Sequence, residues 1–374
     1  MGNGLITSNG AFHARQRRLV QPAFHHRRLV GYTETLARAA EAHVASWRDG
    51  DHVELHRALM DLTFATAAEV MFSARSTRPA EDTPVARMMA DINAGILPQA
   101  LLPAPLTRVP LPANRRYRRA IGELHNVIDE TVSRYRVHGP EHDDLLYALT
   151  AARDEDGQAM PDAQIRDEVV NLMPAGAETT ATVLAWAFHH IARDPDVERR
   201  LADEVAEVRG DRPPRHADLD RLTYTQRVLR ETARLHPLAL IMRRSNAPAV
   251  VAGIPVPPGV EFVVSHYAIH RDARLYDDPL AFRPERWLAP QSAALPKGAY
   301  APFGSGARKC IGDHFAWLSM TVVVATVLRR HRLVPEPGHA PREVPAAHPH
   351  LDRLPMTVRP RRARPGGRGV RGLP

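Results

Sequence analysis

The sequence predicts a mainly α-helical fold with a small β region in its C-terminal third. Apolar residues recur at three- and four-residue spacing through most of the first two-thirds of the chain, as in YTETLARAAEAHVASW, which is typical of amphipathic helices. The stretch AVVAGIPVPPGVEFVVSHYA instead predicts two short β runs around a Pro-Pro-Gly turn. An apolar helix, HFAWLSMTVVVATVLRRH, follows further on, so the β region is expected to lie between helices.

Two of the expected helices have clear faces and ends. One begins at Asp194-Pro195, and its apolar stripe is formed by Val197, Leu201, Val205 and Val208. Another is expected to open with a Thr-x-x-Gln capping box at Thr223 and Gln226 and to end before Pro237.

The segment NLMPAGAETTATVLAWAFHHIA is apolar on nearly all faces, which predicts a helix buried at the centre of the fold. Pro174 removes one backbone amide and Gly176 weakens the next turn, so the helix is expected to be distorted there. Glu178 and Thr179 follow directly. An acid and a hydroxyl at such a point indicate a site that handles a small molecule and protons. The alternative is a satisfied glutamate and a threonine hydrogen-bonded to its own helix.

Composition excludes several classes of protein. The 374 residues are 44% hydrophobic and 25% charged, which predicts a globular chain. A single cysteine rules out an internal disulfide or a cysteine-rich zinc cluster. The formal charge of +8 comes without a nucleic-acid-binding module, and part of it lies in a basic tail, residues 359–374, that is expected to be disordered. Residues 1–358 are expected to form one domain.

The sequence contains no motif for a zinc hydrolase, a phosphate-binding loop, a membrane span or a leader segment. There is no H-E-x-x-H for a zinc hydrolase, and GSGARK lacks the spacing of a phosphate-binding loop. No apolar run is long enough to span a bilayer, and the start has no apolar leader segment, so a cytoplasmic protein without a membrane span is expected.

The only cysteine lies in FGSGARKCIG, residues 303–312. The glycines of this loop let its backbone approach something bulky. Basic neighbours are expected to favour the thiolate of Cys310 over the thiol.

Four motifs in this order resemble the cytochrome P-450 family of haem-thiolate monooxygenases, over nearly the whole chain. The family's loop pattern F-x-x-G-x-R-x-C-x-G is matched by Phe303, Gly306, Arg308, Cys310 and Gly312. Its central-helix pattern is matched by Ala175, Gly176, Glu178, Thr179 and Thr180. E-x-x-R is matched by Glu231 and Arg234, and the family's P-E-R-F by PERW, in which Trp287 stands for phenylalanine and follows Arg286.

The resemblance implies a haem b cofactor whose iron is bound by the Cys310 thiolate. HARQR matches a W/H-x-x-x-R pattern of propionate-binding residues, and Arg243, with Arg244 as the alternative, matches another. The implied cofactor-binding set is His13, Arg17, Ala175, Gly176, Arg243, Phe303, Gly304, Arg308, Cys310 and Gly312. Glu178 and Thr179 would be catalytic and deliver protons. Glu231, Arg234 and Arg286 would form a buried triad with a structural role.

The implied reaction inserts one oxygen atom from O2 into a lipophilic small molecule. Electrons would come from NAD(P)H through a ferredoxin reductase and a ferredoxin, for which Arg15, Arg18 and Lys309 are candidate contacts. The first third of the chain resembles bacterial terpene oxygenases, particularly those that act on the sesquiterpene pentalenene, so a role in terpene or antibiotic biosynthesis is expected. Fatty acids, polyketides and macrolides remain alternative substrates. Residues 238–241 would form an apolar wall of the pocket.

One departure from the family concerns the start of the chain. Family members have a β region and further helices before the segment that matches HARQR, so the fold is expected to miss the N-terminal strands and first helices. We expect roughly sixty to ninety upstream codons in frame. The alternative is a non-catalytic or degenerate haem-binding protein.

Overall fold

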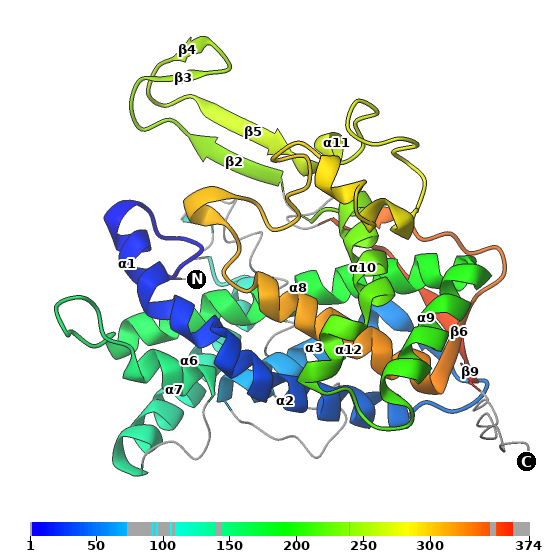
Figure 1. Ribbon diagram of the computed structural model, residues 1–374. Helices are drawn as coiled ribbons and strands as arrows, with labels where there is room; N and C mark the ends of the chain where they lie inside the picture. Colours follow the sequence, from blue (N-terminus) through cyan, green and yellow to red (C-terminus); the bar gives the residue numbers. More distant parts are fainter. Residues whose placement is uncertain are drawn as a thin grey trace, which may run out of the picture.

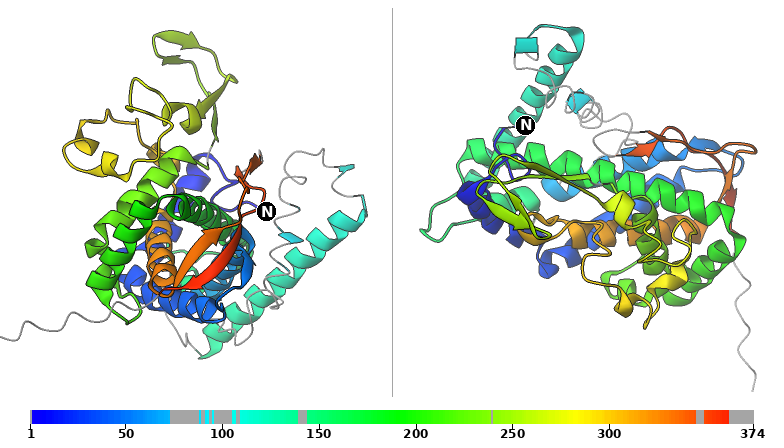
Figure 2. Two further views of the ribbon diagram at one scale, coloured as in Figure 1. Left: turned by 90° about the vertical axis from the view of Figure 1, so that its right-hand side faces the viewer. Right: turned by 90° about the horizontal axis from the view of Figure 1, so that it is seen from above.

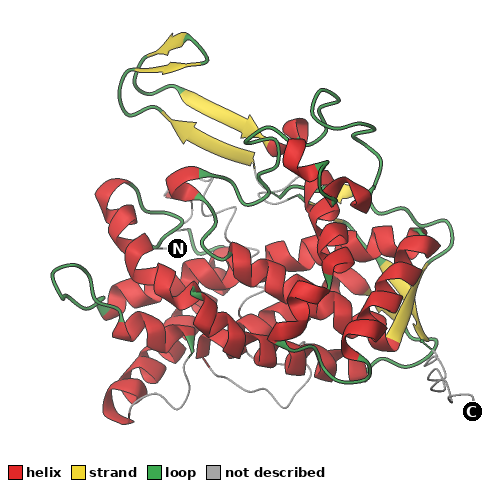
Figure 3. Ribbon diagram, in the orientation of Figure 1, coloured by secondary structure: helices red, strands yellow, loops and turns green. Residues whose placement is uncertain are grey.

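The computed structural model describes residues 2–72, 88, 91–92, 95, 105–106, 109–138, 144–238, 240–344 and 349–361. Helices dominate these ranges, and the predicted mainly α-helical fold is confirmed (Figure 3). The α-helices are α1 (Gly10–Val20), α2 (His26–Ala45), α3 (Leu55–Phe72), α6 (Pro112–His138), α7 (Leu145–Ala151), α8 (Asp162–Arg193), α9 (Pro195–Arg209), α10 (Thr223–Leu235), α11 (His266–Ile269) and α12 (Asp313–Arg330).

Helix α8 runs through the middle of the molecule, as its apolar faces predict (Figure 1). It packs against α3, α6, α9, α10 and α12, and it contributes to two large apolar clusters, one on each half of its length. The helix is continuous through Pro174. Seen from the side in Figure 2, the helices gather around a common axis, while α6 extends away from them.

The β structure is split into small antiparallel units. Strands β1 (His52–Glu54), β9 (Pro355–Pro360) and β6 (His331–Pro335) form one sheet at the end of α12. Strands β2 (Leu240–Arg244) and β5 (Glu261–Ser265) form a ribbon that projects from the helices (Figure 1). The hairpin of β3 (Ala249–Val251) and β4 (Ile254–Val256) stands at its tip, and β7 (Glu343–Val344) pairs with β8 (His350–Leu351).

The two short β runs predicted around the Pro-Pro-Gly segment, residues 257–259, are confirmed as β4 and β5. These two strands do not pair with each other, because they belong to different ribbons. The hairpin turn is at Ala252-Gly253, where both residues have positive φ. The strand that pairs with β5 is β2, which lies before the hairpin in the sequence.

The predicted apolar stripe of α9 is confirmed, since all four of its residues are buried. The predicted capping box of α10 is wrong: Gln226 donates to the Leu219 carbonyl, and Thr223 does not cap its own helix. Instead, the Glu204 carboxylate of α9 accepts hydrogen bonds from the backbone amides of Tyr224 and Thr225 at 2.6 and 2.8 Å. A carboxylate at a helix N-terminus accepts hydrogen bonds from the free backbone amides, as a capping box would, and its charge interacts favourably with the helix dipole.

Beyond β9, residues 362–374 of the expected basic tail lie outside the described residues. Among the helices described, none combines the length and the hydropathy that a bilayer span requires.

Candidate active site

The loop of Phe303 to Gly312 holds Cys310 immediately before α12. The Cys310 amide donates to the Phe303 carbonyl at 2.9 Å, which closes the loop on itself. Gly304 has a φ of +70°, and a Cβ built on it would lie 3.1 Å from the Ile241 side chain. A larger residue there would be strained and crowded. Cys310 is an exposed residue, although the surrounding protein partly desolvates its sulfur.

The prediction that the surroundings favour the Cys310 thiolate is wrong for the free thiol. Desolvation by the surrounding protein raises the pKa of Cys310, and this effect outweighs the Gly312 N–H directed at the sulfur and the charges of Arg17 and Lys309, which lower it. Lys309 is paired with Asp313 at 2.5 Å, and the Asp313 carboxylate itself raises the Cys310 pKa. The raised pKa favours the protonated form of the free sulfur near neutral pH, and binding to a metal ion would favour the thiolate.

Four basic side chains gather beside this loop: His13 and Arg17 on α1, Arg243 on β2, and Arg308. Burial and the charges of Arg308 and Arg17 lower the pKa of His13. Burial and the Arg243 charge lower the pKa of Arg308. None of the four forms an ion pair with a carboxylate in the described part of the chain. Arg244, the alternative to Arg243, is paired with Glu261 at 2.5 Å. The cluster fits an anionic ligand.

Across from the loop, α8 presents a half-buried face that includes Ala175, Gly176, Glu178 and Thr179. A Cβ built on Gly176 would meet no atom within 4 Å, so this face borders open space. The Thr179 hydroxyl donates to the Ala175 carbonyl at 2.7 Å, so this threonine is hydrogen-bonded to its own helix, as the alternative interpretation of the segment proposed. Its oxygen keeps lone pairs that can accept a further hydrogen bond.

Glu178 makes no hydrogen bond or ion pair with the residues that the structure describes. The interpretation of Glu178 as a satisfied structural carboxylate therefore finds no support there. A half-buried carboxyl without a protein partner is available to exchange protons with solvent or ligand.

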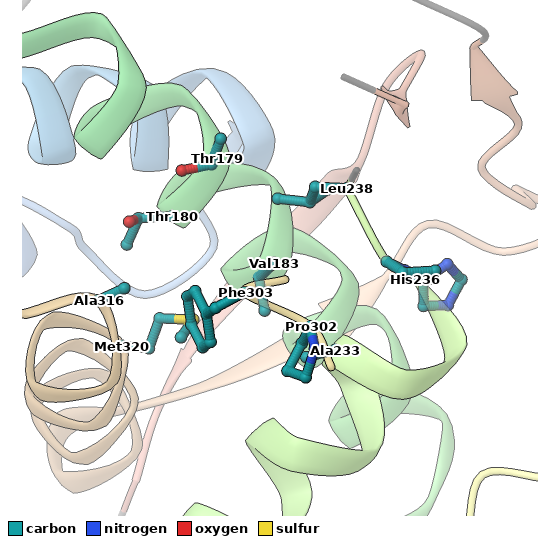
Figure 4. Close-up of a pocket in the computed structure, with 11 residues that line it drawn as sticks. Thr179, Thr180, Val183, Ala233, His236, Leu238, Pro302, Phe303, Ala316 and Met320 are labelled. Atoms are coloured by element: carbon teal, nitrogen blue, oxygen red, sulfur yellow. The ribbon is translucent and has the colours of Figure 1, made fainter. Parts of the chain in front are cut away.

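A small hollow of about 40 Å³ lies between α8, α10, α12 and the cysteine loop (Figure 4). Thr179 and Thr180 border it on one side and Phe303 on another. The remaining lining residues are Val183, Ala233, His236, Pro237, Leu238, Pro302, Ala316 and Met320. Of the predicted wall 238–241, Leu238 faces this hollow and Ile241 contacts the cysteine loop. Ala239 lies outside the described residues.

The structure brings Glu231, Arg234 and Arg286 together behind the loop. Glu231 Oε1 lies 3.1 Å from Arg286 Nε, and both side chains are at least nine-tenths buried. Trp287, which stands where the family motif has phenylalanine, donates its Nε1–H to Glu231 at 3.0 Å. The indole is thus a second donor to Glu231 Oε2, which also accepts from Arg234 Nε at 2.9 Å; a phenylalanine would leave that oxygen with Arg234 alone.

The predicted basic contact face is largely neutralised within the chain. Arg15 is paired with Asp154 at 2.6 Å, Arg18 with Glu155 at 3.1 Å, and Lys309 with Asp313. Asp154 and Glu155 lie far along the sequence from Arg15 and Arg18, so sequence spacing did not indicate these two pairs; Asp313 is only four residues from Lys309.

Comparison with known proteins decides the family. The family model for cytochrome P-450 matches residues 1–355. The chain belongs to the cytochrome P-450 family. Pentalenene oxygenase of Streptomyces avermitilis is 38% identical over 362 residues, covering 96% of this chain and 80% of that protein. Cyclooctatin synthase of Streptomyces melanosporofaciens is 39% identical, covering 90% and 74%. A cytochrome P-450DA heme domain superposes with a TM-score of 0.88 at 26% identity, covering 96% and 80%.

This cytochrome P-450 is a monooxygenase, as its family and its named relatives show, and the family implies a haem-iron cofactor. The residues present fit that group. The exposed residue Cys310, four basic side chains without an ion-paired carboxylate among the described residues, and a hollow whose described lining has no charged side chain lie around one space. They correspond to the iron, the propionates and the apolar ring of a haem. The relatives' names favour an oxygenase over the non-catalytic haem protein.

Two features of the site had no recognisable signal in the sequence. His236 borders the hollow, and its ring stacks on Trp186 with 3.7 Å between centroids. The first residues of the chain lie along α8 and reach Arg308. Both depend on contacts between segments that are far apart in the sequence.

Proposed function

We propose that this P-450 inserts one oxygen atom from O2 into a terpene, with a sesquiterpene hydrocarbon such as pentalenene as the favoured substrate. The observation that carries the proposal is the similarity to pentalenene oxygenase and cyclooctatin synthase. The part of the hollow between Thr179 and Phe303 that a haem would not fill is suited to an apolar ligand. Its described lining contains no carboxylate, lysine or arginine. A hydrocarbon has no group to pair with such charges, and burying it against apolar side chains gains about 25 cal/mol per Å². The names of the similar Streptomyces proteins point to the same substrate class.

We assign cofactor binding to the residues that surround this space. Cys310 would hold the iron of haem b, and His13, Arg17, Arg243 and Arg308 would hold its propionates. The two faces of the haem would be lined by Ala175 and Gly176 on one side and by Phe303, Gly304 and Gly312 on the other. The bound haem supplies the activation of O2 for insertion into a C–H bond. Residues 1–358 form one P-450 domain in this proposal.

In this proposal the residues that supply protons lie on α8. The Thr179 hydroxyl is held by the Ala175 carbonyl, so its oxygen is oriented with its free lone pairs away from that bond. It can accept a hydrogen bond at the face of the hollow, and it can pass a proton on when its O–H turns away from the Ala175 carbonyl and a new proton reaches its oxygen. Glu178, one residue earlier and free of a described partner, can take up protons from water. These two residues are the proposed catalytic groups, and Glu231, Arg234 and Arg286 are a structural support.

Electrons would arrive from NAD(P)H through a ferredoxin reductase and a ferredoxin, which assigns the reaction to the cytoplasm, where NAD(P)H is supplied. Because Arg15, Arg18 and Lys309 are already paired, we expect a moderate dependence of electron transfer on ionic strength rather than a steep one.

The test is turnover of the haem-loaded full chain with a ferredoxin system, NADPH and ¹⁸O₂. Pentalenene is compared with a long-chain fatty acid and a macrolide. The proposal predicts one ¹⁸O atom in a product from the terpene and little product from the others. Product from the fatty acid or the macrolide alone would overturn the substrate class while leaving the monooxygenase assignment intact.

A further inference from the structure

The first residues of the chain lie along one face of α8. Backbone amides of this segment donate to side chains that follow one another on that face. Asn3 N donates to Asp167 at 2.8 Å, and Leu5 N donates to Glu168 at 2.8 Å. Residues 164, 167, 168 and 171 are spaced as one helical face.

Two further contacts complete the attachment. Ile6 N donates to the Asn171 side chain at 3.2 Å, and Gln164 donates to the Asn3 carbonyl at 2.9 Å. Glu168 and Asn171 are fully buried. The Leu5–Glu168 hydrogen bond is therefore shielded from water and the Ile6–Asn171 bond partly so, whereas the Gln164–Asn3 bond is exposed. A buried carboxylate that loses its donors is costly, which favours the attached state of the segment.

The far end of the same segment holds Arg308. Its Nη2 donates to the Ser8 carbonyl at 2.6 Å and to the Asn9 side chain at 2.8 Å. Ser8 is in turn bonded to Gly4 through its amide, at 2.9 Å, so the two ends of the segment are joined by a tight turn. A continuous chain of hydrogen bonds therefore runs from α8 to the guanidinium of Arg308.

We propose that residues 2–9 form a strap that fixes Arg308 to α8, with Glu168 and Asn171 as positioning residues for its guanidinium. The strap sets the direction in which Arg308 meets an anion in the cation cluster. It also joins the helix that carries Glu178 and Thr179 to the loop that carries Cys310. The consequence for cofactor retention rests on the proposed function, in which Arg308 binds a haem propionate.

Gly4 offers a way to release the strap from a distance. A Cβ at this position would lie 2.5 Å from Asn171 Nδ2 and 2.6 Å from the backbone oxygen of Asp167, so Gly4→Ala must push the segment away from α8. The matched control is Gly31→Ala on α2, where an added Cβ meets nothing within 4 Å. Asn9→Ala is a milder second variant, because the Asn9 side chain does not cap α1 and touches Arg308 directly.

The first measurement needs no haem. Phenylglyoxal modification of Arg308 in the full chain is followed by peptide mass spectrometry, with Arg17 and Arg243 as internal references and amide exchange of residues 2–9 measured in parallel. We expect Gly4→Ala to raise the Arg308 rate by about threefold or more, as loss of hydrogen bonds to a charged group implies, with a smaller rise for Asn9→Ala. Gly31→Ala should match the parent. Glu168→Leu should act as Gly4→Ala does, and Glu168→Gln, which keeps one acceptor oxygen, should restore much of the parental rate.

Faster amide exchange of the strap in Gly4→Ala with an unchanged Arg308 rate would overturn the proposal. The second measurement is the rate at which the loaded protein loses haem. We expect this rate to rise across the variants together with the rate of Arg308 modification by phenylglyoxal. A raised Arg308 rate with parental haem loss would support the strap and overturn the propionate role of Arg308. The two failures are therefore distinguishable.

Discussion

Glu231 and Arg234 form an ion pair in which both side chains are completely buried, with 2.8 Å between Oε1 and Nη2. Arg234 also donates to the carbonyl oxygens of His270 and Pro279, each at 2.7 Å. Burying a charge is costly unless its hydrogen-bonding capacity is satisfied, and here both partners meet that condition. The pair thus fastens α10 to the irregular segment that leads into the cysteine loop.

Replacing Glu231 with alanine should destabilise the protein strongly, because Arg234 would stay buried without its counter-charge. Broken buried ion pairs cost about 3–5 kcal/mol. The change is measured as the free energy of unfolding in urea, together with haem content. Glu123→Ala is the control: its partner Arg119 is an exposed residue four positions earlier on α6, and such pairs contribute less than about 0.5 kcal/mol. Equal losses in the two variants would contradict the structural role of the buried pair.

Thr179→Ala should separate oxygen consumption from product formation. Removal of the hydroxyl leaves the hollow apolar and open to substrate, but it takes away the group that passes protons at its face. We expect substrate binding and NADPH oxidation to persist while product per NADPH falls and peroxide rises. Thr131→Ala is the control, since its hydroxyl makes the same bond to its own helix on α6, far from the hollow. An unchanged product-to-NADPH ratio in Thr179→Ala would assign Thr179 a packing role only.

The stability of the protein should fall on mild acidification. Burial lowers the pKa of His43 to about 4, and its Nε2 has no hydrogen-bond partner among the residues that the structure describes. The unfolded chain protonates this histidine near pH 6.5, so the stabilisation is complete above that pH and is lost as the pH falls from 6.5 towards 4. Burial also lowers the pKa values of His189 and His270 to about 4, and these residues add to the effect.

His43→Leu should therefore flatten part of the pH dependence, measured as urea unfolding midpoints at pH 7 and pH 5. His314→Leu is the control, because the His314 side chain is 79% exposed and solvent surrounds it in both states. If the urea unfolding midpoint of His43→Leu changed between pH 7 and pH 5 by as much as that of the parent, His43 would not contribute to the pH dependence.

The sequence predicted the helices well because their signal is local. The apolar stripe of α9 and the apolar faces of α8 arise from residues within one helix, and the packing follows from them. The capping of α10 and the pairing of β5 could not be predicted in the same way. Glu204 reaches α10 from a neighbouring helix, and β5 pairs with a strand that lies beyond an intervening hairpin.

In the candidate site, too, some features could be predicted from the sequence and others depend on the whole fold. Motif order indicated that Glu231, Arg234 and Arg286 belong together, and the structure places them in contact. Burial reversed the expected effect of basic neighbours on Cys310, because desolvation depends on the whole surrounding fold. The strap could not be inferred, since Glu168 and Leu5 are separated by 163 residues.

Cys310 is proposed to hold the haem iron as a thiolate. This is tested by the absorption spectrum of the haem-loaded protein after reduction and addition of carbon monoxide. We expect a strongly red-shifted Soret band for the parent and its loss in Cys310→Ser, whose neutral hydroxyl cannot replace a thiolate donor. A parent protein that retains haem without the red-shifted band, or a Cys310→Ser protein that keeps it, would contradict the claim.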